Sequence, residues 1–184
     1  NAVGGSTVLY AGHFPRLHPS DFRVRTLDGV ADDWPIDYQR LEPYFALNDQ
    51  MTGVAGVAGD PAYPPKEVPL PPVRLGKLGR KMASGFNELG WHWWPSDSAI
   101  VTEEYEGRAP CINAGTCLVG CPQGAKGSSD VTYWPAAQRA GVDDRQIGAA
   151  IVHGDQDVVF AVLANEGRPA LGAPGGDRAQ VDRD

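Results

Sequence analysis

The feature that most constrains this fold is the stretch TGVAGVAGDPAYPPKEVPLPP at residues 52–72, where glycine and proline recur at short intervals. Proline lacks a backbone donor and fixes φ, and glycine leaves the backbone free, so no regular helix can run through the stretch. The whole chain has 23 glycines and 16 prolines among 184 residues. We therefore predict a loop-rich α+β fold with short helices and a few strands, and an extended surface excursion over residues 52–72.

Charge and hydropathy exclude two classes of partner. The formal net charge is -7 and no basic stripe occurs, whereas nucleic-acid binding draws its affinity from clustered Lys and Arg. The longest apolar runs, at residues 147–152 and 158–164, are far shorter than the ~20 residues of a membrane-spanning helix. We thus expect neither a nucleic acid partner nor a membrane span.

The cysteines indicate the cellular compartment of the protein, and the first residue indicates whether the native N-terminus is present. Three cysteines, Cys111, Cys117 and Cys121, are odd in number and close together, which argues for free thiols or a metal site over a disulfide framework. This pattern favours the cytoplasm, with the periplasm left open if the native N-terminus is missing. Because the chain opens on Asn1 and not on Met, we expect its beginning to be absent.

The clearest helix signal lies at residues 74–90. Apolar side chains recur there every three or four positions, which places them on one helical face: Leu75, Leu78, Met82, Phe86 and Leu89. Gly90 stands where a C-terminal cap belongs. We interpret Met82 and Phe86 as core residues.

Shorter helices are predicted on both sides of this one. Within residues 33–50, Asp37 can cap one helix and Pro43 suits the first turn of a second, and another helix runs from Pro135 to about Gly141. We assign Asp49 to a helix end or turn. The aromatic-rich set on the same segment is interpreted as core packing: Trp34, Pro35, Tyr38, Leu41 and Tyr44.

Four segments in a fixed order resemble the glucose-methanol-choline (GMC) oxidoreductases, particularly bacterial dehydrogenases related to gluconate and glucose dehydrogenases. They are NAVGGST at residues 1–7, DWPIDYQRLEPYF at 33–45, GVAG at 53–56 and CINAGTCLVGCPQGAKGSSDVTYWPAA at 111–137. The resemblance covers residues 1–142 and implies a fragment of a two-domain enzyme, in which FAD lies along a Rossmann-type domain and a second domain covers the flavin ring. Residues 1–142 would carry the flavin-contact loop and part of the substrate side.

The resemblance also implies the residues that contact the cofactor. Glycines let main chain lie against a flat ring or a pyrophosphate, and small hydroxyl residues can donate hydrogen bonds to ligand oxygens. Tyr10 stands where the family commonly has Asn or His, and it can stack or hydrogen bond through its hydroxyl. The implied cofactor-binding set is Asn1, Val3, Gly4, Gly5, Ser6, Thr7 and Tyr10.

No catalytic residue is assigned. In the family, a histidine near the far C-terminus takes the proton of the substrate hydroxyl while hydride passes to flavin N5. None of His13, His18, His92 and His153 lies in a matching segment. We expect His13 and His18 in a surface loop, His92 among its neighbouring tryptophans and His153 at a turn, and we predict no turnover by this chain alone.

The cysteine segment admits three interpretations. The spacing C-x5-C-x3-C followed by Pro122 is compatible with buried structural thiols, which we place first, with an iron–sulfur cluster second and with zinc third. No metal ligand is assigned. The run around Lys126 is not a phosphate loop, because the required G-x-x-x-x-G-K-[ST] spacing is missing.

Residues 143–184 do not continue the resemblance. IGAAIV and VVFAVLA could pair as a hairpin, and the Gly, Ala, Arg and Pro richness that follows raises the hypothesis of a frameshift. Three functions stay open: a fragment of an FAD-dependent enzyme acting on CH–OH groups of small alcohols, polyols or sugars, a non-catalytic truncated product or binding module, and an iron–sulfur electron-transfer segment. The first requires missing parts of the same enzyme or a partner subunit.

Overall fold

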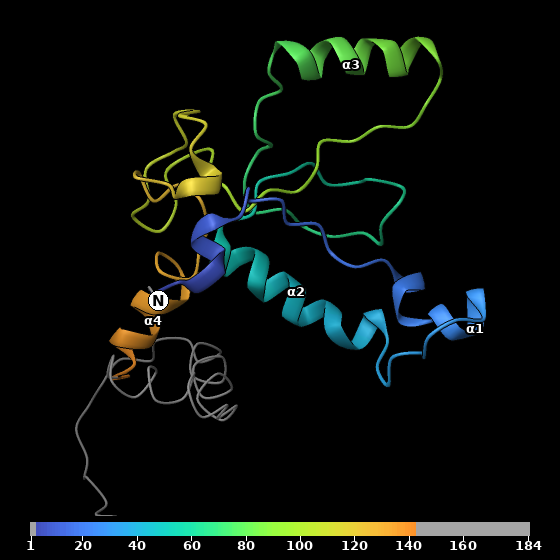
Figure 1. Cartoon of the computed structure of the whole chain (residues 1–184), viewed down its shortest axis with the longest axis horizontal. Coiled ribbons are helices and arrows are strands. Elements are labelled where there is room, and N and C mark those ends of the chain that lie inside the picture. Colours follow the sequence, from blue (N-terminus) through green and yellow to red (C-terminus); the bar gives the residue numbers. More distant parts are fainter. Residues whose placement is uncertain (1–2, 143–184) are drawn as a thin grey trace, which may run out of the picture. The chain divides into compact units, whose positions relative to one another are not determined.

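A computed structural model describes residues 3–142, which are mostly loop with short helices (Figure 1). The chain divides into two compact units, residues 1–135 and 136–184. The predicted hairpin and frameshifted tail lie outside the described residues. The helical elements are η1 Gly5–Leu9, η2 Pro19–Phe22, α1 Val24–Asp28, α2 Tyr38–Thr52, α3 Lys77–Glu88, η3 Cys117–Val119 and α4 Tyr133–Arg139.

The loop-rich architecture with short helices agrees with the prediction. Within residues 3–142 the β-structure consists of isolated bridges, fewer and shorter than the strands that the sequence led us to expect. Every helix in this part of the chain is too short or too polar to cross a bilayer. The helix predicted from Pro135 begins two residues earlier, at Tyr133.

Short extended segments meet through these bridges and build the core of the first unit. Ser98 bridges to both Ala55 and His13, and Ile100 bridges to Lys126. Ala55 and Ser98 exchange two backbone hydrogen bonds of 2.8 and 2.9 Å. The buried cluster around them consists of Ala55, Leu70, Val101 and Ala125. Segments far apart in sequence are therefore fixed to one another mainly by backbone pairing and small side chains.

The glycine- and proline-rich stretch enters this core. Beyond Gly53 no helix crosses residues 54–72, as predicted. The predicted surface location is wrong for the beginning of this stretch, because Val54 and Ala55 are only 1% and 0% exposed. Their small side chains let the backbone pass close to the segment at residues 98–101, where hydrogen bonds to it replace those of a helix.

Helix α2 is one helix where two were predicted. Asp37 caps it as expected and accepts a hydrogen bond of 2.8 Å from the backbone N–H of Arg40. Pro43 lies inside the helix. It removes a single intrahelical bond, to the carbonyl of Gln39 near the N-terminus, where that oxygen can be solvated, so the helix continues.

The aromatic set of residues 34–44 is mostly not in the core. Tyr38 is buried, but Trp34 and Tyr44 are 54% and 63% exposed, so the predicted core packing is wrong for them. Phe22 is buried beside Tyr38 and makes edge contacts with the rings of Trp34 and Tyr38 at centroid distances of 5.8 and 6.5 Å. Phe22, on η2, is a core residue that the sequence analysis did not identify.

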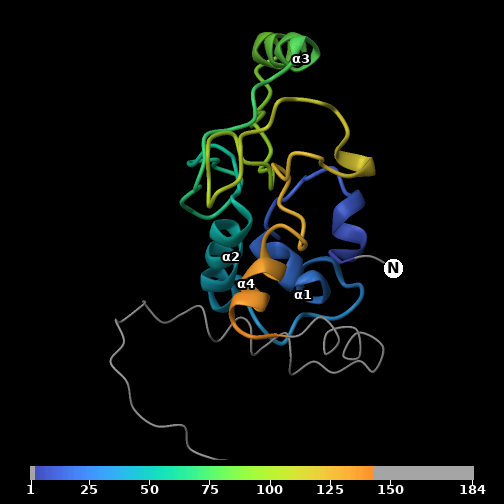
Figure 2. The same cartoon turned by 90° about the vertical axis from the view of Figure 1, so that its left-hand side faces the viewer.

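Helix α3 has the predicted period and the predicted end. The N–H groups of Gly90 and Trp91 bond to the carbonyls of Asn87 and Phe86 at 3.2 and 2.9 Å, which is the double capping bond of a Schellman motif. The predicted core role of its apolar face is wrong, because Met82 is exposed and Phe86 is only half-buried. Within the first unit, α3 stands apart from α2 in both views (Figures 1 and 2).

Candidate functional site

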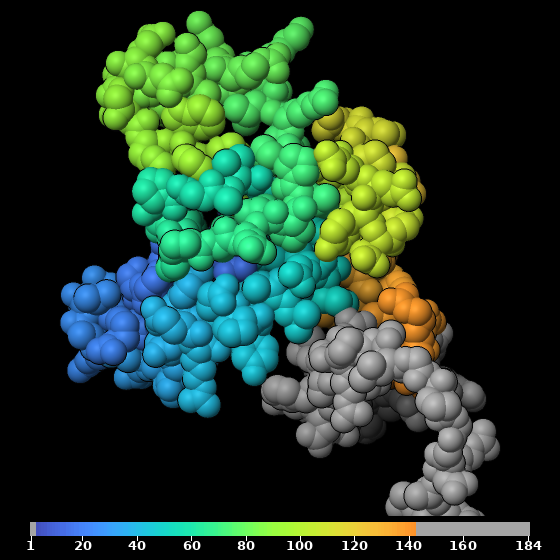
Figure 3. Space-filling view, turned by 180° about the vertical axis from the view of Figure 1, so that it is seen from behind, coloured from blue at the N-terminus to red at the C-terminus, as the bar shows by residue number. Residues whose placement is uncertain are grey.

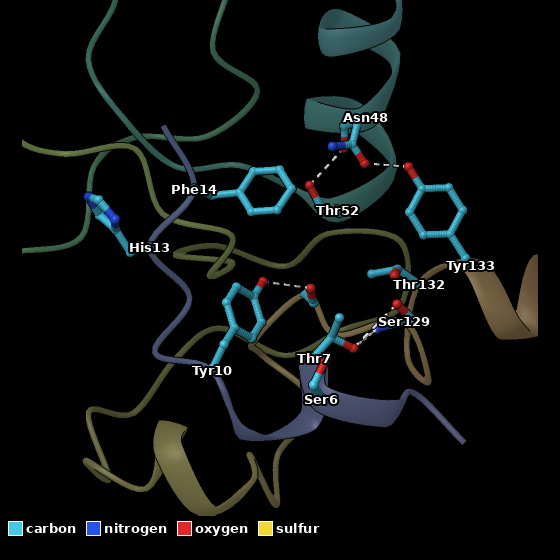
Figure 4. Close-up of a pocket in the computed structure, with 11 residues that line it drawn as sticks. Ser6, Thr7, Tyr10, His13, Phe14, Asn48, Thr52, Ser129, Thr132 and Tyr133 are labelled. Carbon is cyan, nitrogen blue, oxygen red and sulfur yellow. Dashed lines mark hydrogen bonds between the residues drawn. The ribbon is translucent and has the colours of Figure 1, made fainter. Parts of the chain in front are cut away.

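A pocket of about 470 Å³ lies in the first unit, where η1, the C-terminal end of α2 and residues 127–133 meet (Figure 4). Most of its side chains carry hydroxyl groups, and none is Asp, Glu, Lys or Arg. It is lined by Ser6, Thr7, Tyr10, His13, Phe14, Asn48, Thr52, Gly127, Ser129, Thr132 and Tyr133. The lining therefore offers neutral donors and acceptors next to aromatic rings.

The glycine motif forms the entry to η1. Gly4 has φ 89°, and a Cβ there would lie 2.8 Å from Val8 Cγ2 and 3.0 Å from Asp130 Cβ, so only glycine fits. A Cβ on Gly5 would meet nothing within 4 Å. The backbone at Gly5 thus borders open space, and Ser6 and Thr7 follow it along the pocket wall.

Two hydroxyls of the motif are used differently. The Thr7 hydroxyl donates to the Gly4 carbonyl at 2.5 Å and accepts from the backbone N–H of Ser129 at 3.0 Å. It ties η1 to the end of the cysteine segment. The Ser6 hydroxyl has no hydrogen-bond partner among residues 3–142, which leaves it free to meet a ligand.

Tyr10 lies between η1 and the loop at residue 127. Its hydroxyl donates to the Gly127 carbonyl at 2.8 Å. Burial raises the pKa of Tyr10 to about 12, with the Arg108 cation opposing and the Cys117 thiol adding to the rise. The phenol is therefore neutral, its hydroxyl is held by the protein, and its ring faces the pocket together with that of Phe14 (Figure 4).

Lys126 holds the backbone of the segment that carries Tyr10, and the sequence analysis did not identify it as part of the site. It is 1% exposed, and its Nζ donates to the carbonyls of Val8, Tyr10 and Cys117 at 2.6, 2.9 and 2.7 Å. All three donors of the ammonium are thereby satisfied, and it lies 4.9 Å from the Tyr10 ring centroid. The signal in the sequence was a single lysine between the small residues Ala125 and Gly127.

Helix α2 supplies the opposite wall, which sequence reasoning also missed. The Tyr133 hydroxyl donates to Asn48 Oδ1, and the Thr52 hydroxyl donates to the Asn48 carbonyl at 2.7 Å. A Cβ on Gly127 would lie 2.6 Å from the Thr52 carbonyl. The cysteine segment and the end of α2 are in close contact because residue 127 has no side chain.

A buried ion pair joins the loop after Phe14 to α2. Arg16 Nε and Nη2 donate to Asp49 Oδ2 at 2.9 and 2.7 Å, and Nη1 donates to Glu42 at 3.1 Å. Burial raises the pKa of Asp49, and Arg16 opposes that rise. The predicted helix-end role of Asp49 holds for its backbone carbonyl, which accepts from the N–H of Val54. The ion pair of its carboxylate was not predicted.

The histidines lie away from the middle of the pocket. His13 is exposed, as predicted, and its side chain lies to one side of the other lining residues in Figure 4. His18 stacks on Tyr63 at 4.0 Å between ring centroids. His92 stacks on Trp94, as expected, and its Nε2 lies 3.0 Å from Asp60. His153 is outside the described residues.

The cysteines are free and half-buried. Cys111 and Cys121 pack against the core cluster. Because the thiols are only half-buried, their interpretation as buried structural thiols stays a prediction. Backbone N–H groups of residues 123–126 lower the pKa of Cys121 while its burial opposes them. Among residues 3–142 no group of three or more His, Cys, Asp and Glu side chains is arranged to hold a metal ion.

The structure thus gathers part of the set that the sequence proposed. Ser6, Thr7 and Tyr10 line the pocket, and the backbone of Gly4 and Gly5 leads into it. Val3 is 49% exposed and is not part of the lining. Asn1 lies outside the described residues.

Comparisons with known proteins identify relatives that are named as dehydrogenases or oxidases. No protein-family profile matches the chain. It is 49% identical over 149 residues to 2-methyl-1,2-propanediol dehydrogenase of Mycolicibacterium austroafricanum, covering 79% of this chain and 27% of that protein. It is 32% identical over 127 residues to the fructose dehydrogenase large subunit of Gluconobacter japonicus, covering 67% and 23%.

A third relative is 6'''-hydroxyparomomycin C oxidase of Streptomyces lividus, 32% identical over 138 residues, which cover 68% of this chain and 24% of that protein. All three names denote enzymes that oxidise their substrates. The chain spans about a quarter of the length of each of these relatives.

Proposed function

Because the chain belongs to the GMC family of oxidoreductases, we propose that it forms part of an FAD-dependent enzyme that oxidises a CH–OH group of an alcohol, diol, polyol or sugar. The names of the relatives, a diol dehydrogenase and a fructose dehydrogenase subunit among them, support this substrate class. The observation that carries the proposal is the pocket. It brings Ser6 and Thr7 of the glycine motif, together with Tyr10, beside Asn48 and Thr52 of α2.

The residues of the pocket fit a flavin. Its volume of about 470 Å³ lies within the range of roughly 300–1,000 Å³ common for small-molecule sites. Gly5, next to the lining residue Ser6, is exposed, and its missing side chain leaves the main chain there accessible. The rings of Tyr10 and Phe14 offer apolar surface for stacking, and the neutral hydroxyls suit the carbonyl and nitrogen edge of a flavin.

Within this proposal the side chains have separate roles. The free hydroxyl of Ser6 and the hydroxyl of Ser129 would bind the edge of the ring. Thr132 is a positioning residue, because its hydroxyl donates to the Ser128 carbonyl at 2.9 Å. Thr7 and Lys126 are positioning residues, because their hydrogen bonds go to the protein and hold η1 in place. The flavin, when bound, supplies the hydride acceptor.

The chain's own contribution is to bind and orient the flavin. The pocket contains no carboxylate, and its one histidine, His13, is exposed. A base for an alcohol must reach the substrate hydroxyl directly or through one water. We therefore place the group that accepts the alcohol proton outside the described residues 3–142.

A titration tests the site. Purified chain is titrated with FAD while flavin fluorescence and visible absorbance are followed, and the titration is repeated for Ser6→Leu and Ser20→Leu. Ser6→Leu places a larger apolar side chain in the pocket lining and is expected to weaken FAD binding at least tenfold. Ser20→Leu makes the same change on an exposed position of η2 and is expected to leave binding unchanged.

The proposal fails if the wild-type chain shows no FAD binding in this titration, or if both variants bind FAD as the wild type does. The first result would favour the non-catalytic binding module. A visible spectrum of protein purified without oxygen distinguishes flavin from iron–sulfur absorption in the same preparation.

A further inference from the structure

The apolar side of α3 is largely uncovered in the part of the first unit that the structure describes. On this side Phe86 stacks on Trp91 at 6.0 Å between ring centroids. Leu78 and Met82 are 74% and 51% exposed, and Leu89 and Trp91 just beyond are each 62% exposed. Leu78, Met82, Gly85 and Leu89 follow the i, i+4, i+7, i+11 pattern of one helical face. We call these four residues and Trp91 the α3 stripe. In Figure 3 the segment containing α3 forms the green lobe at the top.

The α3 segment has a low intrinsic tendency to form a helix on its own. It has 12 residues, and isolated helices of this length are marginal in water. Gly79 and Gly85 lie in its interior and each lowers helix propensity further. Ala83 is its only buried residue. Packing within the described chain therefore contributes little to keeping α3 helical.

Gly85 indicates that the missing contact is a close one. A Cβ at this position would meet nothing within 4 Å, so no neighbour in the described chain requires a glycine. The residue lies in the middle of the stripe, between Met82 and Leu89, where the absent side chain leaves a notch. Such a notch allows another backbone or a large side chain to approach the helix axis.

We propose that the α3 stripe is covered by polypeptide outside these 184 residues, namely the remainder of the same oxidoreductase chain. The chain spans only about a quarter of its relatives' length, so a full-length protein of that size has ample chain to supply the cover. A helix that needs its partner in order to form requires that partner permanently. A segment of the same polypeptide meets this requirement at any protein concentration, because it is covalently attached. A second copy would meet it only above the dissociation constant of a dimer.

The test uses a chimera of full length. In the 2-methyl-1,2-propanediol dehydrogenase relative, the matching segment is replaced by that of this chain, and hydrogen exchange of the α3 amides is compared with that of the 184-residue chain alone. We expect exchange at least 100-fold slower in the chimera. This inference depends on family membership and not on flavin binding, which is measured in the same chimera.

Matched variants identify the stripe as the contact. Met82→Gln is expected to speed α3 exchange in the chimera at least tenfold, whereas Lys81→Gln, the same replacement on the polar side, is expected to have no effect. Gly85→Ala should slow exchange about fivefold in the chain alone, since alanine favours the helix. In the chimera it should speed exchange, because the methyl group fills the notch.

Three results would overturn the proposal. One is equal α3 exchange in the chimera and in the chain alone. Another is protection in the chain alone that grows with protein concentration, which would identify a second copy as the cover. The third is protection that appears only with vesicles of anionic phospholipid. A chimera with protected α3 and no flavin would contradict the proposed function and leave this inference standing.

Discussion

Replacing Lys126 by methionine should loosen the wall of the pocket that carries the glycine motif. The buried ammonium donates to three carbonyls at 2.6, 2.9 and 2.7 Å, and hydrogen bonds from a charged group contribute about 1.5–3 kcal/mol each. Burying one ammonium costs several kcal/mol, which offsets part of that gain. Lys126→Met keeps the volume and leaves three carbonyls unpaired, so we expect a net loss of about 2–4 kcal/mol in the free energy of unfolding.

Urea unfolding followed by tryptophan fluorescence measures this loss, and FAD titration measures its effect on the pocket. Phe22→Leu is the matched control, because Phe22 is 1% exposed and does not line the pocket, and we expect it to cost about 1–2 kcal/mol. Lys126→Met should weaken FAD binding at least tenfold, and Phe22→Leu should not. The reasoning is refuted if Lys126→Met has the same urea midpoint of unfolding as the wild type, because the three hydrogen bonds would then make no net contribution to the free energy of unfolding.

Three further predictions concern the buried ion pair, the Tyr10 phenol and turnover. Asp49→Asn leaves the buried Arg16 with Glu42 as its remaining carboxylate, so it should lower the free energy of unfolding by about 3 kcal/mol in the same urea assay; an unchanged midpoint would contradict this. Because burial raises the pKa of Tyr10 from 10.0 to about 12, its contribution is complete below pH 10 and is lost as the pH rises from 10 to about 12. After allowance for its partial exposure this loss is on the order of 1 kcal/mol, and Tyr10→Phe should remove it from the pH profile of the melting temperature; an identical alkaline decline in the variant would count against it. Finally, the purified chain with FAD, an alcohol or sugar and an artificial electron acceptor should show no steady turnover, and sustained turnover would place a base within the chain.

Local signals in the sequence predicted the helices better than their packing. Asp37 caps α2 and Gly90 ends α3 because capping depends on residues within one turn of the helix end. Pro43 was assigned to a helix start, yet its place inside α2 costs a single bond near the end of the helix. The period of α3 was evident, but its apolar side was assigned to a core that the first unit does not provide.

The candidate site was only partly predictable for the same reason. Gly4, Gly5, Ser6 and Thr7 form one contiguous motif, so sequence reasoning could select them together. Asn48 and Thr52 belong to a helix that carries no chemical signature at these positions. They reach the pocket because Gly127 lets the cysteine segment approach α2, and no local pattern records that approach.

By itself the sequence determined the oxidoreductase family, the glycine turn before η1, the start of α2, the end of α3 and the loop-rich architecture, because each depends on neighbouring residues or on motifs in order. The tertiary structure alone decided that Lys126 ties three carbonyls together, that Arg16 pairs with Asp49, and that the α3 stripe stays exposed. These outcomes depend on which distant segments come within a few ångströms of one another. A buried charge or an exposed leucine is defined by its neighbours in space, and the chain brings those neighbours together only when it folds.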